Sequence, residues 1–258
     1  MQDKKLIIAG KEFNSRLMLG TGKYPNFKIM KEALEKSGTE IITFAIRRTN
    51  LDNPNEENIL DYIDLKKYTL LPNTAGAKTV EEAVRLARLA RAAGLTDWIK
   101  LEVQPNSKYL LPDPIATVEA TKILAKEGFK VLPYTTDCPI TAEKLIEAGA
   151  VTVMPGLSPI GSGQGVLSLA NIKIILEISS VPVVIDSGIG TASDAALAME
   201  TGADAILVNT AVAHSQYPVL MAEAMKQATI AGRLAYLAGR MPKKAYASAS
   251  SPLEGIIK

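Results

Sequence analysis

Eight short runs of apolar and β-branched residues recur along the chain, separated by longer segments with helical patterns. They cover residues 17–22, 41–48, 69–74, 98–103, 130–136, 151–156, 181–188 and 205–210. Their ends recur about every 27 residues, roughly the length of one strand and one helix. Several runs are continuously apolar, as expected for parallel strands that are covered on both faces. Eight such units predict an α/β fold of the (β/α)₈ type, the TIM barrel, with a doubly wound open sheet as the alternative.

Helix-start signals follow several of these runs. Thr79 and Glu82 have the spacing of a capping box, in which each side chain bonds a free amide of the first turn. Asp113 precedes a proline, which predicts an N-cap followed by proline at the first helical position. Residues 191–202 repeat the capping box with Asp194 and end on a glycine. These signals place the helices between the strands, as the barrel requires.

The chain has no break in composition, so we expect one domain over residues 1–258. Residues 5–13, with a turn at 9–11, predict a short N-terminal hairpin that closes the bottom of the barrel. Residues 247–258 are mostly small and polar, which predicts a flexible C-terminal tail. With 47% hydrophobic residues the chain has enough apolar material for a core, which excludes a disordered protein.

Charge and apolar patterning limit the partners. Twenty-nine Lys and Arg residues against 27 Asp and Glu residues leave a net charge of +2. No broad field therefore favours nucleic acid or an anionic membrane. The first residues carry no stretch long enough for a signal peptide, and no run approaches the length of a membrane span. We therefore expect a soluble cytoplasmic protein.

The chain has a single cysteine, Cys138, and a single histidine, His214. One cysteine cannot form an internal disulfide, and the two side chains cannot supply the ligands of a usual zinc site. We expect Cys138 to be an inert thiol and His214 to lie at a helix start or on the surface. The chemistry of an enzyme with this composition would depend on Lys, Asp, Glu or backbone amides.

Lys100 and Glu102 form the first candidate site. Alternation along the strand 98–103 places both on one face and two apolar side chains on the other. The apolar pair should face the helices, so the charged pair should point into the barrel. Burial or nearby cations would lower the pKa of Lys100 and make it a nucleophile for imine formation, with Glu102 moving protons. A buried structural ion pair, or the opposite polarity with both groups exposed, is the alternative.

The second candidate site follows the seventh and eighth strands. Asp186-Ser-Gly-Ile-Gly190 joins an apolar strand to a helix start, and glycines with free amides there favour an anion such as phosphate. The eighth strand ends with Asn209 and Thr210, and the loops after strands seven and eight are the usual phosphate site of such barrels. Asp186 is also a candidate acid or base. An ordinary turn that needs glycine for its geometry is the alternative.

Further polar groups end other strands. Residues 159–165 contain three glycines, which suits either a loop that wraps an anion or a lid without contacts. Arg47 and Arg48 are neighbours in the predicted strand, so their side chains point to opposite faces and only one can point into the barrel. Asn73 and Thr74 end the third strand, where a ligand contact and a structural role are both open.

Taken in order, these motifs resemble the thiazole synthase family of bacterial thiamin biosynthesis over nearly the whole chain. Each motif is weak alone, but the ordered set is specific. The motifs are Leu17-Met-Leu-Gly-Thr-Gly-Lys-Tyr24, Ile46-Arg-Arg48, Leu71-Pro-Asn-Thr-Ala-Gly76, Ile99-Lys-Leu-Glu-Val103, Ile160-Gly-Ser-Gly-Gln-Gly165, Asp186-Ser-Gly-Ile-Gly190 and Val208-Asn-Thr210. The sequence departs from the family at the mouth of the barrel, where Ser187 stands for the usual alanine and Cys138 for the usual aspartate.

The resemblance implies a (β/α)₈ barrel that forms homo-oligomers, dimers or tetramers, and uses no metal or organic cofactor. It implies condensation of 1-deoxy-D-xylulose 5-phosphate, dehydroglycine from a second enzyme, and sulfur from the C-terminal thiocarboxylate of a small carrier protein. It also assigns roles to residues of this chain. Lys100 would form the imine, Glu102 and Asp186 would be the acid/base pair, and the sugar phosphate would be held by Gly161, Ser187, Gly188, Asn209 and Thr210.

Two other functions share these features. A different Schiff-base phosphosugar barrel, such as an aldolase, would use Lys100 and the phosphate loops without a carrier protein. A non-catalytic barrel that binds a phosphate ligand would use Lys100 only as a structural cation.

Overall fold

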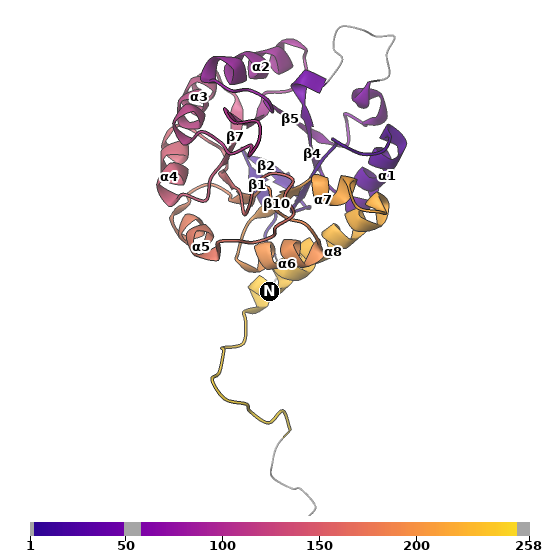
Figure 1. The fold of residues 1–258 in the computed structure, drawn as a ribbon, viewed down its shortest axis with the longest axis vertical. Helices are drawn as coiled ribbons and strands as arrows, with labels where there is room; N and C mark the ends of the chain where they lie inside the picture. Colours follow the sequence, from indigo (N-terminus) through magenta and orange to yellow (C-terminus); the bar gives the residue numbers. More distant parts are fainter. Residues whose placement is uncertain (1–2, 49–57, 252–258) are drawn as a thin grey trace, which may run out of the picture.

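Eight parallel strands form the centre of the protein, and a ring of helices surrounds them (Figure 1). The computed structural model describes residues 3–48 and 58–251. The barrel strands are β3 Leu17–Gly20, β4 Ile41–Ala45, β5 Thr69–Asn73, β6 Trp98–Leu101, β7 Lys130–Thr135, β8 Met154–Pro155, β9 Val184–Ile185 and β10 Ala205–Val208. The predicted TIM barrel is therefore confirmed, and the open sheet is excluded by the closure described next.

The strand order around the sheet is β8-β7-β6-β5-β4-β3-β10-β9. Two parallel bridges, Val153 with Val183 and Gly156 with Asp186, join the first and last strands of this order. The Asp186 amide donates to the Pro155 carbonyl at 3.0 Å across the same seam. The ring of strands is thereby closed, which places the C-terminal ends of all eight strands around one opening.

Seven α-helices follow the barrel strands, and an eighth is packed beside the first and sixth. Their bounds are α1 Phe27–Ser37, α2 Val80–Ala92, α3 Pro114–Lys126, α4 Pro139–Glu147, α5 Leu169–Ile178, α6 Ala192–Glu200, α7 Thr210–Ala213 and α8 Pro218–Ala238. Between β4 and β5, the described residues form two 3₁₀ turns in place of an α-helix, η1 Ile46–Arg48 and η2 Ile59–Tyr62. Asp113 caps α3 as predicted, accepting hydrogen bonds from the amides of Ile115 and Ala116 at 3.0 Å.

Each predicted strand contains an observed strand, but the observed strands are shorter than predicted and most end earlier. The predicted strand 41–48 turns into η1 at Ile46, and the predicted strand 98–103 stops pairing after Leu101. The predicted strands 151–156 and 181–188 retain only two paired residues each, extended by the bridges above. The boundaries were wrong because a strand ends where its pairing with the neighbouring strand ends, and the sequence alone does not show that pairing.

Side chains alternate between two separate cores. Leu19, Ile42 and Leu101 belong to the core between the strands and the helices. Met18 and Leu132 belong to the core inside the barrel. This alternation is the one predicted for Leu101 and Lys100, and it places Lys100 inside the barrel in register with Leu132.

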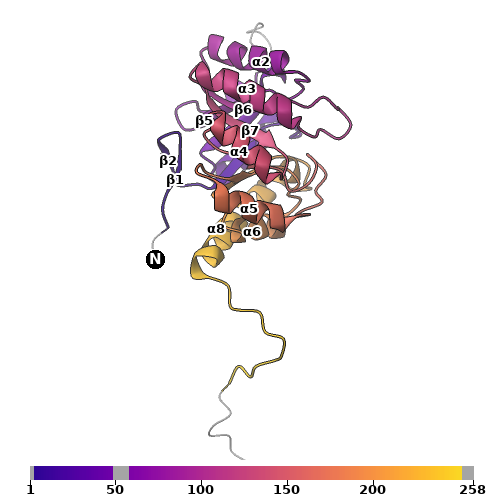
Figure 2. The ribbon, with the colours of Figure 1, turned by 90° about the vertical axis from the view of Figure 1, so that its left-hand side faces the viewer.

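The N-terminal hairpin lies against one end of the barrel (Figure 2). Strand β1, Leu6–Ile8, pairs antiparallel with β2, Lys11–Phe13, through a turn in which Ala9 and Gly10 both have positive φ. Its buried residues Leu6, Ile8 and Phe13 pack into the core inside the barrel. The hairpin therefore closes the bottom of the barrel, as predicted, and leaves the other end open for a site.

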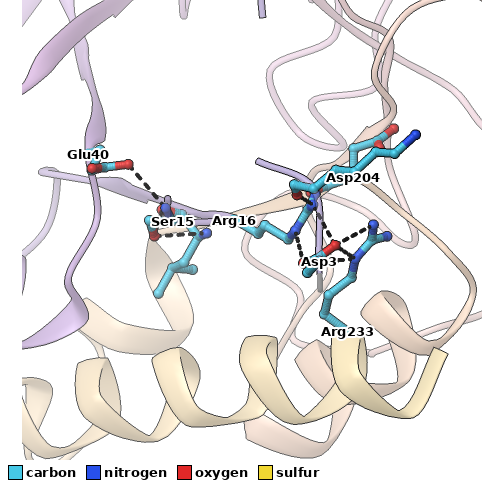
Figure 3. A network of polar contacts seen from close by, with 8 residues as sticks. Asp3, Ser15, Arg16, Glu40, Asp204 and Arg233 are labelled. Carbon is cyan, nitrogen blue, oxygen red and sulfur yellow. Dashed lines mark hydrogen bonds and ion pairs between the residues drawn. The ribbon is translucent and has the colours of Figure 1, made fainter. Parts of the chain in front are cut away.

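A polar network ties the N-terminus to the barrel bottom (Figure 3). Arg16 is 9% exposed and donates to the Asp204 carbonyl at 2.7 Å and to Asp3 at 3.1 Å. Arg233 of α8 donates to the same Asp3 carboxylate at 3.0 Å. Burial opposes the charge of Asp3, but the guanidinium groups of Arg233 and Arg16 outweigh it, so the pKa of this carboxyl is below its usual value.

Replacing Asp3 by Asn should lower the free energy of unfolding by about 1–2 kcal/mol at pH 7, because two guanidinium groups lose their shared anion. A lowered pKa stabilises the fold above the unfolded pKa of about 3.9, and this stabilisation is lost as pH falls through the folded pKa. Denaturant titrations should therefore separate the two proteins at pH 7 and converge once the pH has fallen below the folded pKa of Asp3. Glu119→Gln, a change at an exposed position of α3, is the matched control. A difference that persists in acid would contradict the assignment.

Residues 239–251 follow α8, run away from the barrel without helix or strand, and are exposed (Figures 1 and 2). They include the first part of the predicted tail; residues 252–258 lie outside the described part. No helix in the described residues has both the length and the apolar character needed to cross a membrane.

Candidate active site

A cavity of about 960 Å³ lies at the C-terminal ends of the barrel strands. Its volume is within the range of small-molecule sites in proteins. Every residue that the sequence assigned to the site lines it. These residues are Lys100, Glu102, Gly161, Asp186, Ser187, Gly188, Asn209 and Thr210.

Lys100 lies between two carboxylates at the base of this cavity. Its Nζ is 2.6 Å from Asp186 Oδ2 and 3.0 Å from Glu102 Oε1. All three residues are at most 5% exposed. The alternative in which both side chains are exposed is therefore excluded. The predicted placement of Lys100 and Glu102 on the inner face of the strand is confirmed. Asp186 directly follows β9, and the closure of the barrel places it beside Lys100.

The pKa of Lys100 is shifted upward, whereas burial alone would shift the pKa of a lysine downward. Burial disfavours the ammonium, but the charges of Asp186 and Glu102 outweigh burial, so the pKa is raised. The free protein therefore holds Lys100 as an ammonium ion. Any nucleophilic step must first move a proton from Nζ to a neighbouring carboxylate.

Glu102 lies one residue past the end of β6, and Thr74 holds it in place. The Thr74 hydroxyl donates to the Glu102 carbonyl and accepts from the Glu102 amide, both at 2.8 Å. These bonds replace the strand ladder and preserve the alternation. Thr74 is fully buried and does not line the cavity. Of the two roles that the sequence left open, it therefore has the structural one.

Gln104 and Tyr134 belong to the site, although no sequence motif indicated either of them. Gln104 is 4% exposed, and its Nε2 donates to Glu102 Oε2 at 3.1 Å, which leaves the other oxygen for Lys100. The Tyr134 ring centroid is 5.5 Å from Lys100 Nζ, a cation–π contact. Burial raises the pKa of Tyr134 to about 12, so its hydroxyl stays protonated. Strand alternation could have found Tyr134, since it shares a face with Leu132.

Ser187 turns the chain directly after Asp186. Its φ of 54° is unusual for a residue other than glycine. Its amide donates to Asp186 Oδ1 and its hydroxyl donates to the Ser158 carbonyl, both at 2.8 Å. Both donors of Ser187 are thus engaged in the free protein, and its contact with a phosphate remains a prediction.

Two glycine loops face each other beyond Ser187. Gly188 has a φ of 83°, and a side-chain carbon there would lie 2.7 Å from the Ser158 amide nitrogen. Gly161 has a φ of 70°, and a side-chain carbon there would lie 3.7 Å from Thr210 Oγ1. Glycine is therefore required at Gly188 for close packing, and Gly161 leaves space beside the Thr210 hydroxyl.

Two of the amides that were expected to be free at the start of α6 are already bonded within the protein. The amides of Gly190 and Thr191 donate to Asp194 Oδ2 at 2.9 and 3.2 Å. The capping box predicted at this helix thus supplies its own anion.

Asn209 lines the cavity, and its side chain is bonded to the end of β3 and the residues just after it. In the orientation that satisfies its neighbours, its amide nitrogen donates to the carbonyls of Gly20 and Gly22 at 3.2 and 3.0 Å. A side-chain carbon on Gly20 would lie 2.6 Å from Asn209 Cβ, so the two segments touch closely. Its contact with a phosphate remains a prediction.

The other candidate residues have different positions. Asn73 lines the cavity and donates to Thr43 Oγ1 at 3.1 Å, and Arg47 lines the cavity paired with Glu82 at 3.1 Å. The Arg48 side chain is outside the described part of the structure.

His214 is exposed and lies at the cavity edge, just after α7. Cys138 precedes α4 and is not among the lining residues; hydrogen bonds with Thr141 lower the pKa of its thiol. Within residues 3–48 and 58–251, no group of three or more His, Cys, Asp and Glu side chains is placed to hold a metal ion.

The fold and the site together define a class: a TIM barrel with a buried lysine between two carboxylates and glycine loops beside them. The family model for thiazole biosynthesis protein ThiG matches residues 7–252. The thiazole synthase of Thermodesulfovibrio yellowstonii is 59% identical over 252 residues, 98% of each chain. That of Anoxybacillus flavithermus is 60% identical over 244 residues, 95% of this chain and 96% of the relative. The chain belongs to this family of thiazole-forming enzymes.

A solved structure supports the same grouping. The Amycolatopsis orientalis BexX/CysO complex contains a chain with a TM-score of 0.84 and 35% identity to this protein. The match covers 95% of this chain and all of that one. The likeness therefore extends over the whole barrel.

Proposed function

We propose that this protein is a thiazole synthase that joins 1-deoxy-D-xylulose 5-phosphate, dehydroglycine and carrier-bound sulfur through an imine on Lys100. The single observation that carries this proposal is the placement of Lys100 between Asp186 and Glu102 at the base of the cavity. Membership in the thiazole biosynthesis family supports a thiazole-forming reaction, and the three substrates are those that the sequence resemblance implies.

The first step is a proton transfer. Lys100 starts as an ammonium, and Asp186 at 2.6 Å is the nearer acceptor for its proton. The neutral amine then adds to the ketone carbon of the sugar, and a C–N bond forms as the C=O π bond breaks. The protonated carboxyl returns its proton to the departing hydroxyl, so water leaves and the imine forms.

The second step is rearrangement of the imine. A carboxylate removes a proton from the neighbouring sugar carbon, and the electron pair moves to the imine nitrogen. Glu102 and Asp186 both contact Nζ, so one can accept a proton while the other donates. Sulfur and dehydroglycine then react with the rearranged sugar to complete the thiazole phosphate carboxylate.

The sulfur and nitrogen sources are other proteins. We propose a small sulfur carrier with a C-terminal thiocarboxylate, and a separate enzyme that supplies dehydroglycine. The Amycolatopsis orientalis relative was solved in a complex with CysO, which supports a protein partner for this barrel. A homo-oligomer in the cytoplasm is part of the same proposal.

The test is a reconstitution with the three proposed reactants and mass spectrometry of the products. We expect a thiazole phosphate carboxylate with the thiocarboxylated carrier. A carrier ending in an ordinary carboxylate should give a borohydride-trapped adduct of the sugar phosphate but no thiazole. Cleavage of the sugar without the carrier would indicate an aldolase instead. Binding of the sugar phosphate without any adduct would indicate a non-catalytic barrel.

A further inference from the structure

The end of the cavity that is predicted to hold the phosphate is lined by the neutral residues Gly161, Gly188 and Thr210. The cavity lining includes three cationic side chains, Lys23, Arg47 and Lys100. Lys100 is held by two carboxylates, and Arg47 is paired with Glu82 at 3.1 Å. Lys23 makes no ion pair or side-chain hydrogen bond with any residue that the structure describes, and its side chain is exposed. It is therefore available to a ligand.

The Lys23 ammonium lies beside Gly161, one of the residues predicted to hold the phosphate. A carbon placed on Gly161 would be 4.0 Å from Lys23 Nζ and 3.7 Å from Thr210 Oγ1. The ammonium and the hydroxyl thus converge on the same small volume beside Gly161. A phosphate seated against Gly161 would be within reach of both donors, and a charge-assisted bond to a dianion is stronger than a neutral one.

The backbone holds Lys23 in an unusual conformation. Its φ is 71°, in the left-handed region that few residues other than glycine adopt. The Thr21 amide is bonded to the Thr43 carbonyl at 3.0 Å, and the Asn209 amide nitrogen is bonded to the carbonyls of Gly20 and Gly22. These bonds determine the path of the chain just before Lys23, and such strain is maintained at binding sites when the surroundings hold it.

We propose that Lys23 is the cation that binds the phosphate group of the substrate, and that Asn209 positions the loop that carries it. The proposal rests on the proposed function for the identity of the phosphorylated sugar. The phosphate site itself stands on the geometry of Lys23, Gly161 and Thr210. Lys23 therefore sets the preference for phosphorylated over unphosphorylated ketoses.

The test compares wild type with Lys23→Met, using inorganic phosphate as the probe in ³¹P NMR titrations. Loss of one charge-assisted contact should weaken phosphate binding by about 10- to 100-fold. Lys23→Arg should retain most of the binding. Lys122→Met removes the same charge from an exposed position on α3 and should leave the affinity unchanged. Binding by Lys23→Met within twofold of wild type, or no saturable binding by wild type, would overturn the proposal.

A second measurement separates this proposal from the proposed function. Borohydride trapping with unphosphorylated 1-deoxy-D-xylulose at high concentration should be equal in wild type and Lys23→Met, because Lys100 is unaffected. An equal loss of trapping with both sugars would assign Lys23 to folding or chemistry and overturn the proposal. Should wild type form no adduct with either sugar while phosphate binding still depends on Lys23, the proposed function fails and the phosphate site remains.

Discussion

Lys100→Met should form no borohydride-trapped adduct with 1-deoxy-D-xylulose 5-phosphate, and its thiazole synthesis should fall by at least about 1,000-fold. The reason is that Lys100 supplies the amine at the base of the cavity, between Asp186 and Glu102. Intact-mass and peptide mass spectrometry of the trapped protein is the measurement. In wild type the adduct should map to the peptide that contains Lys100.

Phosphate binding serves as the control that Lys100→Met is folded. Removing the ammonium leaves two buried carboxylates without their cation, which should destabilise the protein by about 3–5 kcal/mol. Inorganic phosphate binding should nevertheless remain close to wild type, since Lys23, Gly161 and Thr210 lie outside the ion-pair cluster. An equal loss of adduct and phosphate binding would point to misfolding. A normal adduct in Lys100→Met would remove Lys100 from the mechanism.

Asp186→Asn and Glu102→Gln should each retain the adduct but lower turnover by about 100- to 10,000-fold. An amide has the shape of the carboxyl group but cannot accept and return a proton. The remaining carboxylate can still take the proton from Lys100, so the imine can form. Single-turnover trapping and steady-state product formation separate the two steps. Glu143→Gln, at an exposed position of α4, is the matched control and should show full turnover.

The pH dependence of adduct formation should also change in Asp186→Asn and Glu102→Gln. Asp186 and Glu102 raise the pKa of Lys100, with the larger charge effect from Asp186. Removing either carboxylate lowers that pKa, so neutral amine is present at lower pH. The pH profile of adduct formation should therefore shift to lower pH, and the shift should be larger in Asp186→Asn. Full turnover or an unmoved profile in either variant would exclude that residue from its proposed role.

Much of the barrel could be predicted from the sequence because its signals are local. The alternation over residues 98–103 placed Lys100 and Glu102 inside, and the spacing of Thr191 and Asp194 predicted a capped helix; both are confirmed. The strand ends were less predictable. Residues 46–48 are as consistent with a strand as with the 3₁₀ turn they form, because the choice depends on neighbouring segments.

The sequence by itself determined the strand-helix repeat, the inward face of β6 and the residue types at the strand ends, since these follow from the period of side chains along the chain. Only the tertiary structure decided what those groups meet. It brought Asp186 to Lys100 and so reversed the expected direction of the lysine pKa, and it brought Gln104 to Glu102. It also turned Lys23 toward Gly161 and Thr210 through a loop held by Asn209. Contacts between distant segments depend on the closure of the barrel, and closure is a property of all eight strands together.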